Sequence, residues 1–405
     1  MSFGIALSGI NAAQSDLNVT ANNIANSNTT GFKQSRSEFA ELFAVSPQGV
    51  SKTQNGAGVK IAEIAQQFTQ GNIEATNNSL DLALSGQGFF TLSDGGVTAY
   101  TRSGAFSTDN AGYVVNAEGQ RLQVYPPTAS GAFNTTTLAD LRLVTGDSAP
   151  AATTTADIVF NLPSNAPQPA VAIFDPANSN SYNDSTSMTI YDSLGAVHTA
   201  SMYFVKTAAV NTWDTRLYID GTAVGGAQTL QYSNTGAITA PVTGKITYPT
   251  YTPSTGAAGL DLTVNYGNTT QYGDSFSVSA ASQDGYTTGR LVGISVDASG
   301  IVQARFTNGR SLSLGQVAIA NFANPQGLQS LGDTNWAETY GSGQVLHGQA
   351  GNSGFGLIQA GSLEQSNVNI TAQLVNMITA QRNFQANAQM IATENQITQS
   401  IINLR

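Results

Sequence analysis

Residues 370–402 read ITAQLVNMITAQRNFQANAQMIATENQITQSII and contain neither proline nor glycine. Counted in alternating steps of four and three, this stretch places a residue from every turn on one helix face with a heptad repeat. The positions on that face are Ile370, Leu374, Met377, Gln381, Phe384, Ala388, Ile391, Asn395, Thr398 and Ile402. At about 1.5 Å per residue the helix would be roughly 50 Å long, more than a small domain covers. The pattern therefore predicts a long helix that needs partners.

The N-terminal segment carries a second helical pattern. Its apolar stripe comprises Phe3, Ala6 or Leu7, Ile10, Ala13, Leu17 and Ile24. Asp16 is the only charged residue before Lys33. The helix is expected to end near residues 26–31, NSNTTG, because these residues favour turns. Two interpretations remain open: both helices pack on one globular domain, or they pair with each other and with further copies of the chain.

The composition excludes several classes of partner. Of the 405 residues only 10% are charged, against about 25% in an average soluble domain. The net charge is -10 and no cluster of Lys and Arg occurs, which disfavours nucleic acid and anionic membrane surfaces as partners. The chain has no cysteine, so disulfides and thiolate metal sites are excluded.

The start of the chain, MSFGIALSGINAAQSDL, lacks the basic residues and sustained apolar core of a Sec signal peptide. No run approaches the roughly 18 apolar residues of a transmembrane helix, so we expect no membrane insertion. If the protein leaves the cell, we expect another export route.

Between the predicted helices the chain divides into four parts. Residues 31–71 form a linking arm, in which Phe32, Phe39, Leu42 and Phe43 anchor a short helix or an extended segment. In the same arm, VKIAEIAQQF is a strand or a short helix. Residues 72–146 and 284–363 are predicted to form one discontinuous β-domain, and residues 147–283 a second β-domain inserted into it.

The strand predictions rest on alternation and on turn residues. LDLALSGQGFFTL alternates through Leu80, Leu82 and Leu84 before a Gly-x-Gly turn. In the inserted part, LDLTVNY alternates from Leu260 to Tyr266. The fold class is thus mostly β, with nested discontinuous β-domains and paired long terminal helices.

No catalytic, cofactor or metal site is expected. His198 and His347 are the only histidines, and neither has a nearby pair of carboxylates in the sequence. Asp175, Asp184 and Asp192 lack the spacing of a calcium loop. What remains is assembly, because two weak helical seams become stable when many copies bury them together. A secreted β-rich adhesin or enzyme is the competing class.

Several motifs then resemble one family. SGINAAQSDLNVTANNIANSNTTGFKQSR, with Asn22, Asn23, Ile24, Ala25 and Asn26 followed by Thr30, Gly31, Phe32 and Lys33, resembles the signature of bacterial flagellar axial proteins, the rod and hook family. The C-terminal GSLEQSNVNITAQLVNMITAQRNF resembles the other end of that family. LDLALSGQGFFTL, YTRSGAFSTDNAGYVVNAEGQRLQVYP and LGQVAIANFANPQGLQSLGDTNWAETYGSG are similar to its hook proteins.

The resemblance implies a non-enzymatic subunit of the hook, a flexible curved tube that acts as a universal joint and transmits torque from rod to filament. Residues 1–30 and 364–405 would form a helical core around the export channel, the discontinuous β-domain a middle layer, and the inserted domain the outer surface. The implied partners are further copies of the chain, the distal rod, hook cap and hook–filament junction proteins, and the type III export apparatus. A distal rod or junction protein is the alternative within the family.

Two sets of residues are predicted to carry this function. The helical assembly interface comprises Phe3, Leu7, Ile10, Leu17, Ile24, Ile370, Leu374, Met377, Phe384, Ile391 and Ile402. Hinge motion is expected where the two β-domains join, at Gly146, Pro150, Gln283, Gly285 and Gly289.

Overall fold

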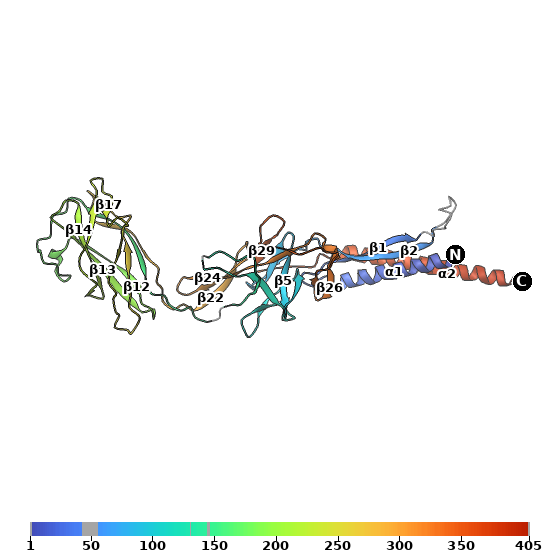
Figure 1. The fold of residues 1–405 in the computed structure, drawn as a ribbon. Coiled ribbons are helices and arrows are strands. Elements are labelled where there is room, and N and C mark those ends of the chain that lie inside the picture. The colour runs from blue at the N-terminus through green and yellow to red at the C-terminus, as the bar shows by residue number, and fades with distance from the viewer. Residues whose placement is uncertain (1, 43–55, 130, 144–145, 404–405) are drawn as a thin grey trace. The chain divides into compact units, whose positions relative to one another are not determined.

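The computed structural model describes residues 2–42, 56–129, 131–143 and 146–403, which form two compact units (Figure 1). Unit 1 comprises residues 1–145, 293–305 and 311–405, and unit 2 comprises residues 146–292 and 306–310. No described helix is long and apolar enough to cross a membrane. Each unit has its own core.

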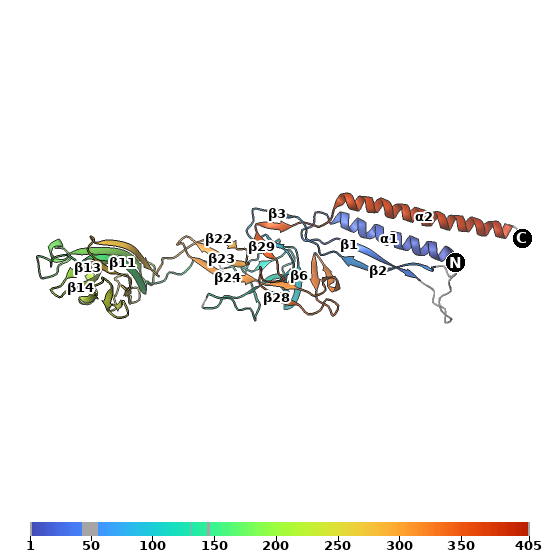
Figure 2. The ribbon, with the colours of Figure 1, turned by 90° about the horizontal axis from the view of Figure 1, so that it is seen from above.

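Two helices from opposite ends of the chain lie side by side in unit 1 (Figures 1 and 2). They are α1 (Ser2–Ala25) and α2 (Ile370–Asn403), which confirms both predicted helices. Asn23 near the end of α1 bonds Gln373 near the start of α2, and Gly9 faces Asn387, so the helices are antiparallel. With 34 residues against 24, α2 continues beyond the start of α1.

A β-hairpin lies along α1 (Figure 2). Its strands β1 (Ser35–Leu42) and β2 (Gly58–Gln66) pair antiparallel, with a register shift between Glu38 and Phe39. For both parts of the arm, the extended alternative is correct and the short helix is not. Phe39 and Leu42 lie on strand β1, and VKIAEIAQQF begins within strand β2. Phe43 lies outside the described residues.

The β-part of unit 1 contains a 13-stranded sheet and two strand pairs. The large sheet contains β5 (Phe89–Asp94), β6 (Val97–Thr101), β7 (Ser107–Thr108), β8 (Val114–Val115), β9 (Arg121–Tyr125), β10 (Ala139–Asp140), β22 (Leu291–Val296), β23 (Ile301–Phe306), β24 (Ser311–Val317), β25 (Ile319–Asn321), β26 (Gln329–Gly332), β27 (Asn335–Ala337) and β28 (Leu346–Gly348). The pairs are β3 (Ile73–Ala75) with β30 (Ser362–Glu364), and β4 (Leu82–Ser85) with β29 (Leu357–Ala360). Strands from both sides of the insertion thus complete one body.

The predicted alternation positions fill this body's core. Leu82 and Leu84 are buried on β4, and the glycines of the following turn, Gly86 and Gly88, have positive φ. A separate aromatic cluster contains Phe89, Tyr100, Phe322 and Trp336, with Phe68 packed against it.

Unit 2 consists of two sheets that share one core, so they pack face to face. One sheet contains β11 (Thr155–Pro163), β18 (Lys245–Thr247), β19 (Thr263–Asn265), β20 (Thr270–Tyr272) and β21 (Ser277–Gln283). The other contains β12 (Asp184–Tyr191), β13 (Val197–Lys206), β14 (Thr212–Ile219), β15 (Thr222–Ala223), β16 (Gln228–Tyr232) and β17 (Ile238–Ala240). Alternate residues of β13 and β14 are buried, as a half-exposed strand requires.

The predicted fold class is confirmed: the chain is mostly β, with its terminal helices packed together. Two short 3₁₀ turns, η1 (Ser179–Ser181) and η2 (Pro325–Gly327), are the remaining helical elements of the described residues.

Candidate assembly site

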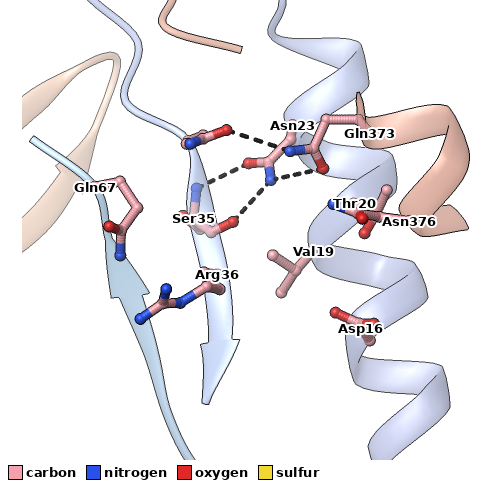
Figure 3. A pocket seen from close by; sticks show the side chains of 10 residues that line it. Asp16, Val19, Thr20, Asn23, Ser35, Arg36, Gln67, Gln373 and Asn376 are labelled. Carbon is pink, nitrogen blue, oxygen red and sulfur yellow. Dashed lines mark hydrogen bonds between the residues drawn. The ribbon is translucent and has the colours of Figure 1, made fainter. Parts of the chain in front are cut away.

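Asn23, in the predicted family motif, joins three elements through its side-chain amide (Figure 3). Its Nδ2 donates to the Ser35 carbonyl at 2.7 Å, and its Oδ1 accepts from the Ser35 amide at 2.9 Å. These two bonds have the pattern of a hydrogen-bonded residue pair in an antiparallel sheet. The buried Asn23 side-chain amide therefore takes the place of a neighbouring strand at the start of β1. Nδ2 also lies 3.4 Å from Gln373 Oε1 on α2. Asn23 therefore holds α1, β1 and α2 together.

The rest of the motif ends α1 and turns the chain. The Asn26 side chain donates to the Asn22 carbonyl at 3.0 Å and accepts from the Thr29 hydroxyl at 3.1 Å. Five residues later, Gly31 adopts φ +71°, and a Cβ there would strike the backbone of residues 102 and 103. Its amide donates to the Glu364 carbonyl at 2.8 Å. Only glycine fits this position without strain.

Three buried charges lie beside this turn. Lys33 Nζ is 2.5 Å from Glu364 Oε1, and both side chains are fully buried. Arg102 Nη1 is 3.4 Å from Glu364 Oε2, with 4% of its side chain exposed. The Gly71 amide donates to Glu364 Oε1 at 2.8 Å. Burial lowers the pKa of Lys33, and the negative charge of Glu364 offsets part of that effect. Glu364 thereby fixes both chain ends to the β-body.

Sequence reasoning missed this cluster, although it quoted the motifs that contain all three residues. The scarcity of charge was the available signal. In a chain with 10% charged residues, a charged residue within a family motif can be examined as a candidate for a buried ion pair.

Small and polar residues form the contact between α1 and α2. Ala6, Ala13 and Ala380 are buried, and Gly9 leaves room for the Asn387 side chain. Gln373 is also buried and donates to Gln34 Oε1 at 3.2 Å. The helices approach closely at Gly9, where a Cβ would strike the Asn387 side chain.

The predicted interface residues therefore fall into two groups. Ile10, Leu17, Ile24, Met377, Phe384 and Ile391 are partly buried. By contrast, Phe3, Leu7, Ile370, Leu374 and Ile402 are exposed by 44–62% within one chain. Val375, Ile378, Met390, Ile397 and Ile401, which the heptad reading did not select, are also exposed. The helix pair thus carries substantial apolar surface that its own chain leaves uncovered.

A polar cavity of about 170 Å³ lies between α1, β1 and α2 (Figure 3). Asp16 and Arg36 line it, together with the Asn23 amide and Gln373. Burial raises the pKa of the Asp16 carboxyl. Apart from Val19, the residues that line the cavity are polar.

The predicted hinge residues lie in two segments that bond to each other within unit 2. Backbone bonds join Ser148 to Gly289 and Ala151 to Tyr286. A Cβ on Gly285 would strike Thr153, whose hydroxyl donates to Gln283 at 2.9 Å. A Cβ on Gly289 would likewise strike the Asn308 side chain, so Gly285 and Gly289 both occupy close-packed positions. Gly146, by contrast, has nothing near its Cβ position.

The expectation that no pair of carboxylates lies near a histidine is wrong for His198. The fold brings two carboxylates to His198: Asp220 Oδ2 lies 2.5 Å from Nδ1 and Asp192 Oδ2 lies 3.3 Å from Nε2. Asp192 also accepts from Thr255 at 2.7 Å, and the Tyr251 ring lies against the imidazole. Asp220 is 22 residues away in sequence, across the β13–β14 pair, so linear spacing did not reveal it. Among the described residues, no group of three or more His, Cys, Asp or Glu could hold a metal ion.

This cluster makes the stability of unit 2 depend on pH. Burial lowers the pKa of His198, but the hydrogen bonds and charges of Asp220 and Asp192 outweigh burial and raise it above its usual value of about 6.5. The stabilisation is complete below about pH 6.5 and is lost as pH rises through the folded-state pKa. We expect this loss of unit 2 stability to disappear in His198→Gln, measured by hydrogen exchange of β13 and β14 between pH 5.5 and 9. The same loss in the variant would contradict the assignment; His347→Gln is the control.

Comparisons with known proteins fit the two-ended arrangement. Residues 3–33 match the family "Flagella basal body rod protein", and residues 359–404 match "Flagellar basal body rod FlgEFG protein C-terminal". Residues 83–171 match "Flagellar hook protein FlgE/F/G D1 domain", and residues 161–286 match "Flagellar basal body protein FlaE D2 domain". Helical ends of the rod type joined to these β-domains define an axial protein of the bacterial flagellum.

Full-length relatives narrow the class. The chain is 39% identical to the flagellar hook protein FlgE of Salmonella typhimurium and to that of Escherichia coli, over 100% of each chain. It is 34% identical to FlgE of Borreliella burgdorferi, over 98% of each. The chain belongs to the flagellar hook protein family, and it is a structural subunit of the extracellular hook.

A solved structure agrees at the level of fold. The crystal structure of Helicobacter pylori flagellar hook protein FlgE2 is similar with a TM-score of 0.55 at 15% identity, covering 72% of this chain and 100% of that one. The prediction of a non-enzymatic hook protein is confirmed by the relatives, and the adhesin and rod or junction alternatives are set aside.

Proposed function

We propose that the exposed apolar surfaces of α1 and α2 are the contacts through which copies of this chain polymerise into the hook. The supporting observation is the number of large apolar side chains that the folded chain leaves exposed on two helices. Ile370 and Leu374 on α2 and Phe3 on α1 are each nearly half exposed. Completing the burial of such a side chain contributes about 1 kcal/mol. One pair of copies gains little, but a helical array repeats the contact for every subunit.

The C-terminal turns of α2 support the same proposal. They extend beyond α1, and Ile397, Ile401 and Ile402 are exposed by 51–63%. α2 carries only two charged side chains, Arg382 and Glu394, so neighbouring helices meet little charge repulsion. These turns would pack against the helices of the next copy.

This contact between copies implies a position in the hook for each of the other parts of the chain. The helix pair would line the central export channel, the β-body of unit 1 would form the middle layer, and unit 2 the outer surface. Distal rod, hook cap and hook–filament junction proteins and the type III export apparatus would be the other partners. As part of a universal joint, the tube would bend while it transmits torque.

Bending also needs a site of motion. Because the segments around Ser148 and Gly289 are bonded to each other, we propose that they move together rather than independently. Flexion would then concentrate at Gly146, where no described atom lies within 4 Å of a Cβ position. The fixed side of this hinge would be the two hydrogen-bonded segments, which contain Pro150, Gln283, Gly285 and Gly289.

Leu374→Asp tests the assembly surface. The side chain is 47% exposed, so the charge leaves the monomer folded but must be desolvated between copies. We expect polymerisation to be lost, observed by electron microscopy and sedimentation, while the helical circular dichroism of the monomer is kept. Leu374 is a cleaner site than Phe384, which also packs within the chain.

The matched control is Asn383→Asp, which adds the same charge at an exposed polar position of α2 without removing apolar surface. It should assemble nearly as the parent does. Normal hooks from Leu374→Asp would show that this face of α2 is not a contact between copies.

A further inference from the structure

The guanidinium of Arg102 is buried, and one of its nitrogens, Nε, has no hydrogen-bond partner. Its side chain is 4% exposed, and it makes one long bond, 3.4 Å, to Glu364 Oε2. Its Nε is buried without any partner. A guanidinium has five N–H donors, and leaving such donors unpaired in the interior is costly. The folded chain therefore leaves the Arg102 guanidinium short of a hydrogen-bond acceptor.

The balance of charge around Arg102 also indicates that a negative group is missing. Glu364 is shared, because Lys33 Nζ and the Gly71 amide both bond to its Oε1. Two basic side chains thus face one carboxylate, and among the described residues Glu364 is the one acidic side chain that acts on Arg102. A second negative group would balance the cluster.

Space for such a group exists beside Arg102. A cavity of about 230 Å³ is lined by Arg102 and by Phe68, Phe89 and Phe322. Gln87 and Ala323, which are exposed, lie on its rim. The Arg102 guanidinium lies 5.4 Å from the centre of the Phe89 ring, which fixes its plane against one wall. The cavity is large enough for a carboxylate or a phosphate and opens to solvent beside Gln87 and Ala323.

We propose that this cavity is an oxyanion-binding site in which Arg102 holds a carboxylate or phosphate group. The same chemistry is available from two sources: a dissolved oxyanion, or an Asp or Glu side chain of a second copy of the chain. The second source rests on the proposed assembly, whereas the first does not.

The two tryptophans provide a test on the full-length monomer. Trp336 packs against Phe68 and Phe89 with ring centres 5.4 and 5.7 Å away, whereas Trp213 is buried in unit 2. With fluorotryptophan incorporated, ¹⁹F NMR reports each unit separately. Titration with inorganic phosphate or acetate at constant ionic strength should shift the Trp336 signal saturably and leave the Trp213 signal in place. Arg102→Gln should abolish the response, and Arg305→Gln, an exposed arginine, should keep it.

Gln87→Glu tests the same site without changing Arg102, and so covers the case in which Arg102→Gln does not fold. This isosteric change retains Arg102 and supplies a carboxylate at the rim, so the phosphate response should weaken at least tenfold. Gln329→Glu, also exposed but away from the cavity, is its control.

The source of the anion is distinguished by assembly. If the monomer responds to phosphate or acetate in an Arg102-dependent way, the site takes dissolved oxyanions. If the monomer is silent but Gln87→Glu alone raises the critical concentration for polymerisation several-fold, the site takes a neighbour's carboxylate. If neither occurs, or if Arg102→Gln responds as the parent does, the proposal is wrong; Leu374→Asp would still test the helical contacts separately.

Discussion

Glu364→Gln is expected to destabilise unit 1 by about 3–5 kcal/mol, the usual result of removing one partner from a buried ion pair. The amide keeps the shape of the side chain and can still accept from the Gly71 N–H. It cannot balance Lys33 or Arg102, which remain buried at 0% and 4% exposure. The loss should be visible as faster hydrogen exchange in α1, β3 and β30 of the full-length monomer.

Two internal comparisons make this result specific. Unit 2 amides should be unchanged, because its core is separate. Glu38→Gln removes the partner of Arg36 in an exposed pair, with side chains 40% and 66% exposed, and should cost only about 0–1 kcal/mol. Equal effects of the two substitutions would mean that burial of Glu364 adds nothing to its contribution.

Gly31→Ala is the second substitution for which we expect a large effect. The left-handed φ alone costs a residue with a Cβ about 1–2 kcal/mol. In addition, the methyl group would strike the backbone around Ser103, which cannot swing aside as a side chain can. The bond from the Gly31 amide to the Glu364 carbonyl would then be lost or stretched.

Gly119→Ala separates these contributions. Gly119 has φ +83°, but nothing lies within 4 Å of its Cβ position. Its alanine variant should lose only the conformational part, so Gly31→Ala should lower the unfolding midpoint of unit 1 clearly further. Similar midpoints would show that the chain accommodates a Cβ at residue 31.

The elements that sequence reasoning predicted were those with long local patterns. The periodicity of residues 3–24 and 370–402 defined both helices, and alternation at Leu82 and Leu84 identified a buried strand. The motif around Asn22 to Phe32 identified the family before its geometry was visible.

What sequence reasoning could not supply were contacts between distant segments. The heptad positions selected the bulky residues, yet the contacts between the two helices include Gly9 with Asn387 and Asn23 with Gln373. The Lys33–Glu364 pair spans 331 residues, and Asp220 reaches His198 only through strand pairing. Such partners depend on the three-dimensional path of the chain, which periodicity does not encode.

The bonded segments at Ser148 and Gly289 have an evolutionary consequence. The long segment of unit 2, residues 146–292, begins and ends in backbone that is paired at Ser148 and Gly289. A domain attached in this way can be lengthened, shortened or exchanged for another whose ends lie equally close together. The strands β9 and β24 would still meet in the same register at Val124 and Val317. We therefore expect residues 148–289 to tolerate replacement as a module while the rest of the subunit keeps its fold.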